Sequence, residues 1–294
     1  MLEKNTSSEH GKTYYWIEKR NLPYSLVFLH GLTANHHLFD RQIEVFDEQY
    51  GIIVWDAPAH GKSRPYKDFS YYNAAEELKA ILDIEGIKNV VLIGQSAGGF
   101  VAQSFYKKYA DMVKGIITIG TCPYSPSYYS KSDLFWLRQT KWMFRLYPDG
   151  ILRETMAKMC GNTRRARENM LNMLSDYTKD ELCNLMYIGF AGFIPEISEM
   201  NIKCPMWLLV GELDKTGKVM AYNKMCHKKE GVPLYIIEGA AHNANDDQPE
   251  QVNELINAFL QALKLPDTIE LGGGARLLSC VGLGVRLKPE RVSS

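Results

Sequence analysis

Short runs of apolar residues alternate with polar, helix-like segments along most of the chain. Each run is a candidate buried strand, because branched or long apolar side chains follow one another with little polar interruption. The runs lie at residues 13–17, 26–29, 52–55, 90–93, 116–119, 206–210 and 234–237, the first as an edge strand. Strands separated by helical segments predict a mostly parallel sheet with helices on both faces, which is the α/β class.

Two of the intervening segments have a clear helical period. Within residues 72–84, Leu78, Ile81 and Leu82 fall on one face. Within residues 252–263, apolar side chains recur at i, i+3, i+4, i+7 and beyond, and Pro249 suits the first turn of that helix.

Residues 122–203 interrupt the alternation with about four predicted helices and no convincing strand. The segment holds seven of the twelve methionines, together with Trp136 and Trp142. We expect most of these side chains to form the core of a helical insertion and some to line an adaptable apolar pocket. The predicted organisation is a core of residues 1–121 and 204–264, a helical cap of residues 122–203, and a tail of residues 265–294. The apolar residues of the tail follow neither a helical nor a strand period, so we expect the tail to be disordered or introduced by cloning.

The amino-acid composition indicates which broad classes of protein the chain does not resemble. Of 294 residues, 46% are hydrophobic and 23% charged, and the net charge is zero, so we expect no nucleic-acid partner. No apolar run reaches the ~18 residues of a membrane span, and residues 1–12 lack the apolar core of a signal peptide. The six cysteines are scattered without a CxxC pair and are expected to be reduced, which predicts a cytoplasmic location. The oligomeric state has no sequence signal.

Residues 94–98, Gly-Gln-Ser-Ala-Gly, follow the strand at 90–93 and precede a helical run. This strand–turn–helix context is that of a nucleophile elbow. A side chain at Gly94 or Gly98 would collide with the neighbouring strand or helix, so Ser96 is expected on a strained turn that exposes its hydroxyl. The backbone N–H of Ala97, at the helix start, is a candidate donor to an oxyanion. A random match to the pattern has a chance of about one in ten in such a chain, so other residues must support it.

A nucleophilic serine needs a base to take its proton and a carboxylate to orient that base. Asp214 follows the strand at 206–210, and His242 follows the strand at 234–237. Both lie beyond the carboxyl ends of strands, where α/β sheets place their sites. Asp214 could instead cap a helix that starts near Gly217.

Other titratable residues are rivals or have simpler roles. Glu212, Asp246 and Asp247 remain open as alternative acids, although the last two better suit a helix N-terminus. His36 and His37 are read as loop residues at the pocket rim rather than metal ligands, because sequence neighbours seldom converge on one ion. We interpret His60 as structural.

The sequence resembles the α/β-hydrolase superfamily over residues 13–264. The resemblance rests on His30-Gly31 after a strand, the turn at residues 56–63, the elbow, and the Gly-x-x-Asp and late His pair. It implies the α/β-hydrolase fold, with Ser96 as nucleophile, Asp214 as orienting acid and His242 as general base. The backbone N–H groups of Leu32 and Ala97 would form the oxyanion hole. One departure is Ala59, where the family usually carries glycine.

Candidate substrate-pocket residues are His30, Gln95, Cys122, Trp136 and Trp142; for Cys122 a packing role is the alternative.

The resemblance implies a serine hydrolase that cleaves an ester, or a related acyl bond, of a small hydrophobic substrate through an acyl-enzyme, without cofactor or metal. The same triad serves C–C bond hydrolases, thioesterases, acyltransferases and cofactor-free haloperoxidases. A serine at the elbow differs from the aspartate of dehalogenases and epoxide hydrolases, and the loop lacks the HGGG pattern of one lipase branch. Two alternatives come from other classes: a non-catalytic protein of this fold that binds a small ligand, and an interaction module acting through the tail.

Overall fold

The computed structural model describes residues 1–264. Its centre is a sheet with the strand order β1-β2-β4-β3-β5-β6-β7-β8, in which only the pairs β1–β2 and β2–β4 are antiparallel. The strands are β1 (Leu2–Ser7), β2 (Lys12–Glu18), β3 (Ser25–Leu29), β4 (Gly51–Trp55), β5 (Val90–Gln95), β6 (Val113–Ile119), β7 (Met206–Gly211) and β8 (Leu234–Ile237). The prediction of a mostly parallel α/β sheet is confirmed.

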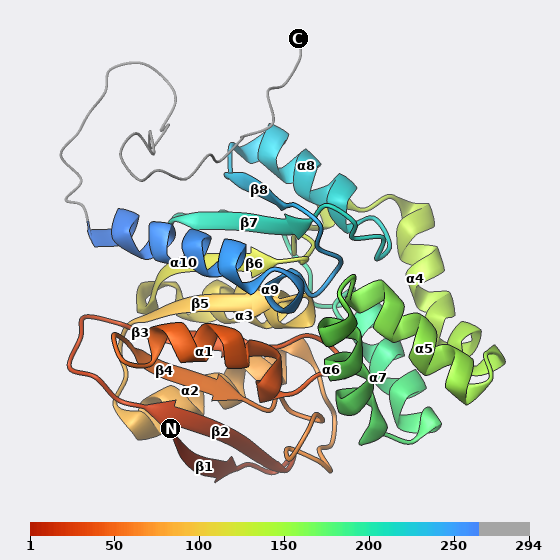
Figure 1. Cartoon of the computed structure of the whole chain (residues 1–294), viewed down its shortest axis with the longest axis horizontal. Coiled ribbons are helices and arrows are strands. Elements are labelled where there is room, and N and C mark those ends of the chain that lie inside the picture. The colour runs from red at the N-terminus through yellow and green to blue at the C-terminus, as the bar shows by residue number, and fades with distance from the viewer. Residues whose placement is uncertain (265–294) are drawn as a thin grey trace.

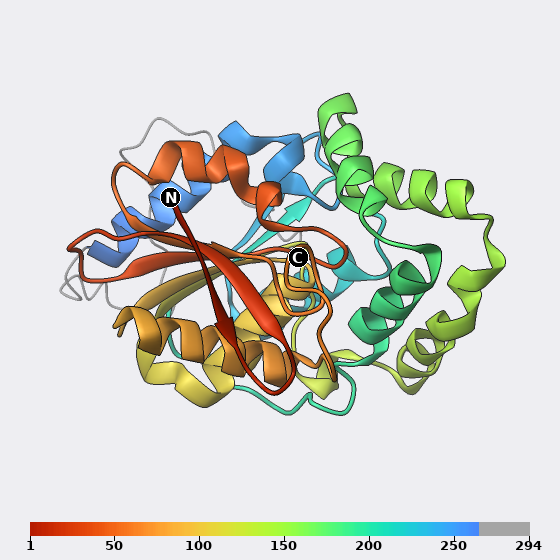
Figure 2. The same ribbon diagram turned by 90° about the horizontal axis from the view of Figure 1, so that it is seen from below.

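Helices cover both faces of this sheet (Figures 1 and 2). On one face lie α2 (Tyr71–Glu85), α3 (Ala97–Tyr109) and α8 (Val219–Glu230), and on the other lie α1 (Asp40–Phe46) and α10 (Pro249–Lys264). Strand β3 shows why two layers form: Leu26 and Phe28 pack with α1 and α10, while Val27 and Leu29 pack with α2 and α3. A strand buried on both faces is apolar throughout, which explains why its period was invisible in the sequence.

The prediction that residues 13–17 form the edge strand is wrong. Strand β2 pairs with β1 on one side and β4 on the other, so β1 is the edge. The β1 sequence, Leu-Glu-Lys-Asn-Thr-Ser, carries no apolar alternation because most of its side chains are exposed. Pairing to β2 through the backbone holds it in place, and backbone pairing leaves no trace in side-chain pattern.

The helical insertion, residues 122–203, connects β6 to β7. It contains α4 (Lys131–Met143), α5 (Asp149–Cys160), α6 (Arg164–Ser175) and α7 (Lys179–Ala191), in agreement with the expected four helices, and short 3-10 turns η3 (Pro126–Tyr128) and η4 (Phe144–Leu146). Helix α4 packs on α7, and α5 packs on α6. Figures 1 and 2 show this layer beyond the carboxyl ends of the parallel strands.

Within residues 1–264, no helix combines the length and apolar character needed to span a bilayer. The predictions for the tail and for Cys280 fall outside the described residues.

A buried carboxylate ties the N-terminal strands to α2. Glu85 accepts from Lys4 Nζ at 2.9 Å and from the Tyr15 hydroxyl at 2.6 Å, and its second oxygen lies 2.8 Å from Lys19 Nζ. Burial raises the pKa of Glu85, but the contacts with Lys19, Tyr15 and Lys4 outweigh it and bring the pKa to about 2. The ionised form therefore stabilises the fold above the ordinary pKa of 4.5 and loses this contribution as the pH falls toward 2.

We expect Glu85→Gln to lower the free energy of unfolding by about 1–3 kcal/mol at neutral pH, because the amide cannot replace a charged acceptor. The difference from the wild type should shrink as the pH falls, since the wild-type carboxylate is then neutralised as well. Urea unfolding at a series of pH values measures this, with the exposed Glu48→Gln as control. A difference that stays constant down to the lowest pH would contradict the assignment.

Candidate active site

Ser96 stands at a sharp turn between the last residue of β5 and the first residue of α3. Its φ of 49° and ψ of −115° are strained for a residue with a side chain and cost about 1–3 kcal/mol. The turn is held because the backbone N–H of Ser96 donates to the Ile119 carbonyl at 2.8 Å. The half-buried side chain therefore projects at the carboxyl edge of the sheet.

The glycines beside Ser96 allow this turn to pass between a strand and a helix. A Cβ on Gly98 would lie 1.9 Å from the carbonyl oxygen of Leu29 in β3, and one on Gly94 would lie 2.5 Å from the backbone nitrogen of Gly99 in α3. These are backbone atoms that cannot rotate away. The predicted collisions at both positions are confirmed.

The structure brings Ser96, His242 and Asp214 together. His242 Nε2 lies 2.9 Å from Ser96 Oγ, and His242 Nδ1 lies 2.8 Å from Asp214 Oδ2. Asp214 and His242 are buried, and Asp214 Oδ1 also accepts from the Thr216 backbone N–H at 2.8 Å. The three side chains come from the turns after β5, β7 and β8. These strands lie close together in the sheet, with only β6 between β5 and β7.

Electrostatics determine where the protons lie in this chain of hydrogen bonds. Burial raises the pKa of Asp214, but the charge and hydrogen bond of His242, with the contacts from Thr216, outweigh it and hold the pKa below its ordinary value. The ionised carboxylate can only accept, so Nδ1 of His242 donates to it. In the neutral form of the ring, Nε2 is then free to accept a hydrogen bond from the Ser96 hydroxyl.

The loop that follows β3 passes directly against the serine. A Cβ on Gly31 would lie 3.0 Å from Ser96 Cβ, so the backbone at Gly31 borders the Ser96 side chain. The Leu32 side chain in turn lies against α7, where a Cβ on Gly189 would meet its Cδ1 at 1.9 Å. Ala97 opens α3, so its N–H has no acceptor within the helix. Both candidate oxyanion donors thus belong to segments that flank Ser96.

The rival acids have other partners. Glu212 accepts from the Gly239 N–H at 2.9 Å, and Asp246 accepts from Asn169 at 2.9 Å. Asp247 accepts hydrogen bonds from the backbone N–H groups of Asn162, Thr163 and Ala241. Asp214 is the carboxylate that faces His242.

A family model described as alpha/beta hydrolase fold matches residues 24–249, a range that includes the elbow and both partners of Ser96. The chain belongs to the α/β-hydrolase family.

Individual relatives and structures of this family are only distantly similar. The chain is 28% identical over 122 residues to a pimeloyl-[acyl-carrier protein] methyl ester esterase of Wigglesworthia glossinidia brevipalpis, which covers 42% of this chain and 44% of that protein. It is 23% identical over 261 residues to Epoxide hydrolase 1 of Caenorhabditis elegans, covering 80% of this chain and 64% of that protein. The match thus spans less than two thirds of either relative. A solved thermophilic esterase from Thermogutta terrifontis superposes with a TM-score of 0.73 at 21% identity, covering 90% of this chain and all of that one.

His30 and Gln95 of this α/β hydrolase, which the sequence predicts to line a substrate pocket, form hydrogen bonds with the loops around Ser96. The buried His30 ring bridges two backbone groups: Nδ1 lies 2.7 Å from the Gly31 carbonyl, and Nε2 accepts from the Ala57 N–H at 2.9 Å. Burial lowers the pKa of His30 to about 4, which keeps the ring neutral. Gln95 donates to Asn243 Oδ1 at 3.0 Å and to the His242 carbonyl at 3.3 Å. Both side chains therefore hold the loops around Ser96 and His242 in place through hydrogen bonds.

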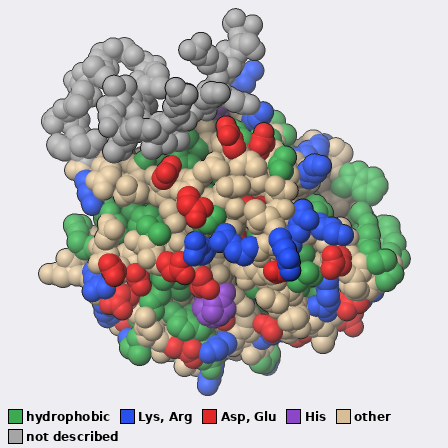
Figure 3. All heavy atoms as spheres, viewed as in Figure 1, with side chains coloured by type: hydrophobic (Ala, Val, Ile, Leu, Met, Phe, Trp, Pro, Cys, Tyr) green, Lys and Arg blue, Asp and Glu red, His purple; other side chains and the backbone are tan. Residues whose placement is uncertain are grey.

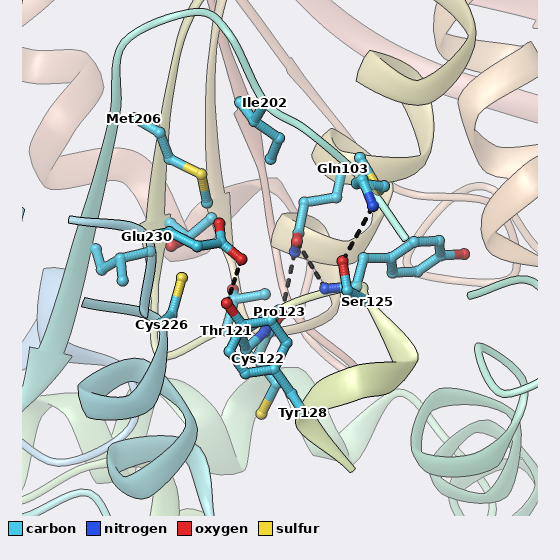
Figure 4. A pocket seen from close by; sticks show the side chains of 14 residues that line it. Gln103, Thr121, Cys122, Pro123, Ser125, Tyr128, Ile202, Met206, Cys226 and Glu230 are labelled. Atoms are coloured by element: carbon cyan, nitrogen blue, oxygen red, sulfur yellow. Dashed lines mark hydrogen bonds between the residues drawn. The ribbon is translucent and has the colours of Figure 1, made fainter. Parts of the chain in front are cut away.

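Cys122 lines a small cavity beside β6 and α8 (Figure 4). The space for a water-sized molecule is about 20 Å³, enough for one water, and Ser96, Asp214 and His242 are absent from its lining. Tyr128 and Glu230 point toward one another across it and form a hydrogen bond. Burial, with the nearby Asp214 charge, raises the pKa of the Cys122 thiol to about 12, so it is a neutral packing group.

The structure does not bring Trp136 and Trp142 to the serine. They lie on α4 with 60% and 52% of their surface exposed. This exposure gives no support to the prediction that these tryptophans line a substrate pocket. An apolar residue type on a helix does not by itself reveal which face is buried.

Three other histidines of this α/β hydrolase contact groups other than Ser96. His36 stacks on Trp16 at 3.5 Å and contacts Asp56 at 2.7 Å, while His37 pairs with Asp40. His60 is buried with Nδ1 2.8 Å from the Pro58 carbonyl, in the turn where Ala59 has a φ of 66°. A left-handed φ explains the family preference for glycine at this position.

Asp247, predicted either as a rival acid or at a helix N-terminus, makes contacts that the sequence did not predict. Its carboxylate accepts from the Ala241 N–H at 2.8 Å, next to His242, and from the N–H groups of Asn162 and Thr163 at 2.8 and 2.7 Å. It therefore joins the histidine loop to the α5–α6 corner of the insertion. Its place in the short α9 (Ala244–Asp247), shortly before Pro249, was the available signal.

We expect Asp247→Asn to lower the free energy of unfolding by about 1–3 kcal/mol, because one of the carboxylate's acceptor positions becomes a donor facing buried N–H groups. Urea unfolding measures the change. The nearby, exposed Glu250→Gln is the control and should leave stability unaltered. Equal stability of the two variants would contradict a joining role for Asp247.

Proposed function

We propose that this protein is a serine hydrolase that cleaves an ester, or a related acyl bond, of a small, largely hydrophobic substrate. The observation that carries the proposal is the continuous path from Asp214 through His242 to Ser96, with links of 2.8 and 2.9 Å. A neutral imidazole that accepts from a serine on a strained turn is the arrangement needed to activate a hydroxyl group. A protein that only binds a ligand has no need of it.

In the first half-reaction, Ser96 Oγ attacks the carbonyl carbon while His242 Nε2 takes the hydroxyl proton. The carbonyl oxygen becomes an oxyanion, which the N–H groups of Leu32 and Ala97 stabilise. Asp214 stays ionised and stabilises the imidazolium across the 2.8 Å contact. When the tetrahedral intermediate collapses, the leaving alcohol takes the proton from Nε2, and the acyl group remains on Ser96 as an ester.

Water completes the reaction in the second half. His242 takes a proton from a water molecule, the resulting hydroxide attacks the acyl carbon, and Ser96 leaves with the proton returned by Nε2. The products are a carboxylic acid and free enzyme. Each step moves one proton through the same nitrogen, so no cofactor or metal enters the chemistry.

We propose that the helical insertion acts as a cap over this site and that its apolar side chains select the substrate. Support comes from the contact of Leu32, beside Ser96, with Gly189 of α7. Nearby, Phe100 of α3 stacks on Phe193 with ring centroids 4.7 Å apart, so core and insertion share an apolar seam. A relative that acts on a methyl ester is consistent with a carboxylic ester as the substrate class.

The first test is labelling with a fluorophosphonate probe, followed by mass spectrometry of the digested protein. One adduct on the peptide that carries Ser96 is expected. Correctly folded protein without an adduct would argue for the ligand-binding alternative.

The apolar seam predicts a preference among substrates. In a panel of p-nitrophenyl esters, kcat/KM should rise with acyl chain length by about fourfold per methylene until the pocket is full, because each buried methylene contributes about 0.8 kcal/mol. Matched esters with a charged acyl terminus are the control and should be poor substrates. Equal turnover of charged and apolar esters would contradict the hydrophobic assignment.

We also propose a cytoplasmic location. The five cysteines within the described part of the chain are free thiols, which suits a reducing compartment.

A further inference from the structure

The insertion carries a dense group of exposed apolar side chains on its outer edge. We call it the apolar ridge: Phe135, Trp136, Trp142, Met143, Leu146, Tyr147 and Ile151. It occupies α4, η4 and the start of α5. The most exposed member, Leu146, shows 72% of its surface. Figure 3 shows hydrophobic side chains projecting at the edge of the molecule where Figure 1 places α4.

This grouping differs from the scattered apolar residues of an ordinary surface. Within residues 1–264, sixteen large hydrophobic side chains are exposed, and seven of them fall in the seventeen residues from 135 to 151. Single exposed apolar residues need no explanation, but a contiguous patch marks a surface that contacts another phase or molecule. Helix α4 also packs on α7, and its ridge residues are large hydrophobic side chains that this packing leaves exposed.

Cations accompany the ridge. Lys131, Arg138 and Arg145 are exposed along the same stretch, and within residues 1–264 no carboxylate lies within 4.0 Å of Lys131 or Arg138. Asp133, the acidic residue of α4, is neutralised at 2.6 Å by Lys218 and also caps the helix. Arg145 is 3.8 Å from Asp180, a loose surface contact. The ridge therefore combines aromatic side chains with unneutralised positive charge.

We infer that the apolar ridge docks the protein on the surface of a bilayer that contains anionic lipid. Exposed Trp, Phe and Leu beside Lys and Arg are the side chains of helices that lie in a membrane interface. Trp and Tyr are suited to this depth because each has an apolar body and a polar edge. Anionic headgroups supply the negative charge that the protein itself does not place beside Lys131 and Arg138.

The same charges argue against a second copy as the occupant. A two-fold symmetric contact through the ridge would bring Arg138 and its symmetry mate to one interface without a carboxylate between them. The inference goes beyond the proposed function and does not depend on it. If both hold, docking would bring the enzyme to hydrophobic esters that concentrate in bilayers.

The test is co-sedimentation of the full chain with phosphatidylcholine vesicles, with and without phosphatidylglycerol. Binding is expected to the anionic vesicles, with a blue shift of tryptophan emission and weaker binding in high salt. Trp136→Ala with Trp142→Ala should weaken binding by about tenfold or more, because both rings lose their burial in the interface. Arg138→Gln should weaken it by about fivefold, the effect of one cation near an anionic surface.

Controls separate docking from general effects. Ile84→Ala removes an exposed apolar side chain on α2, and Lys88→Gln removes an exposed cation in the next loop; both should bind like the wild type. Circular dichroism and fluorophosphonate labelling of the tryptophan variant should match the wild type, which separates a failure of docking from a failure of the proposed catalysis.

Two results would overturn the inference. One is binding that is absent from anionic vesicles or unchanged in the tryptophan variant. The other is self-association in sedimentation velocity that the tryptophan variant abolishes, which would assign the ridge to a second copy of the chain.

Discussion

Replacing Ser96 with alanine is expected to lower kcat for ester hydrolysis by about a millionfold, the scale seen when a serine hydrolase loses its nucleophile. The variant loses the atom that forms the acyl-enzyme, and neither His242 nor the oxyanion donors can replace it. The backbone turn should survive, because the Ser96 N–H that donates to Ile119 is retained and the strained φ is held by its neighbours. A residual rate above that of water alone is expected from binding and the oxyanion hole.

The measurement is kcat/KM with a short-chain p-nitrophenyl ester, together with fluorophosphonate labelling of the same preparation. Ser104→Ala is the matched control, because it makes the same substitution in α3, away from His242. The control should keep activity within about threefold of the wild type, well below a kcal/mol of transition-state stabilisation. If Ser96→Ala retained wild-type turnover or still formed the adduct, the nucleophile would have to be another residue.

The three residues of this site were predictable because each follows the carboxyl end of a strand. Ser96 follows β5, Asp214 follows β7 and His242 follows β8, and parallel strands bring such positions to one edge of a sheet. The order along the chain and the glycines of the elbow add local constraints that are visible in the sequence. Packing of the sheet then brings one of the several candidate carboxylates, Asp214, against His242.

The residues that support the site could not be predicted in the same way. Gln95 is one position from the serine, yet its side chain donates to Asn243 and to the His242 carbonyl. These contacts depend on the alternation of side chains along β5 and on the loop after β8, which meet only in the folded chain. Likewise, Asp247 could be recognised as acidic but not as the acceptor for the corner at Asn162, because that corner is distant in sequence.

Exposure was the other property that the pattern could not resolve. Trp136 and Trp142 have the residue type of a core, but the face of α4 that they occupy points outward. Strand β1 shows the reverse case, since polar side chains lie on a strand that is part of the sheet. Hydrophobic pattern predicts burial only where the partner surface is a core, so edges and interaction surfaces are where it fails.

Asp214→Asn is expected to lower kcat by about ten-thousandfold while leaving the fold intact. An asparagine amide that faces Nδ1 can donate its N–H there, which favours the ring tautomer with the proton on Nε2. Nε2 would then donate to Ser96 Oγ instead of accepting from it, and the base would be lost. The Thr216 N–H keeps its acceptor in the variant, since the amide oxygen can replace Oδ1.

Asp246→Asn is the matched control. Asp246 was an alternative candidate for the orienting acid, and it is likewise buried but accepts from Asn169. Burial raises the pKa of Asp246, so this carboxyl group loses less on becoming an amide than one whose charge is stabilised. Its kcat should stay within about tenfold of the wild type, which is less than 1.4 kcal/mol in the barrier. Equal losses in the two variants would mean that both buried carboxylates matter for stability and that Asp214 has no special role in orienting His242.

The pH dependence of the wild type separates the two members of the Asp–His pair. Because the pKa of Asp214 is held below its ordinary value, its charge persists on mild acidification and is not what activity loses first. His242, once protonated, can no longer accept from Ser96, so kcat/KM should fall as the pH decreases, with a slope of one proton. A steeper fall, with two protons taken up together, would mean that Asp214 titrates with the histidine and that the carboxylate is not stabilised by its partners. A single-proton fall in the wild type, combined with the loss in Asp214→Asn, would assign base and orienting acid to different residues.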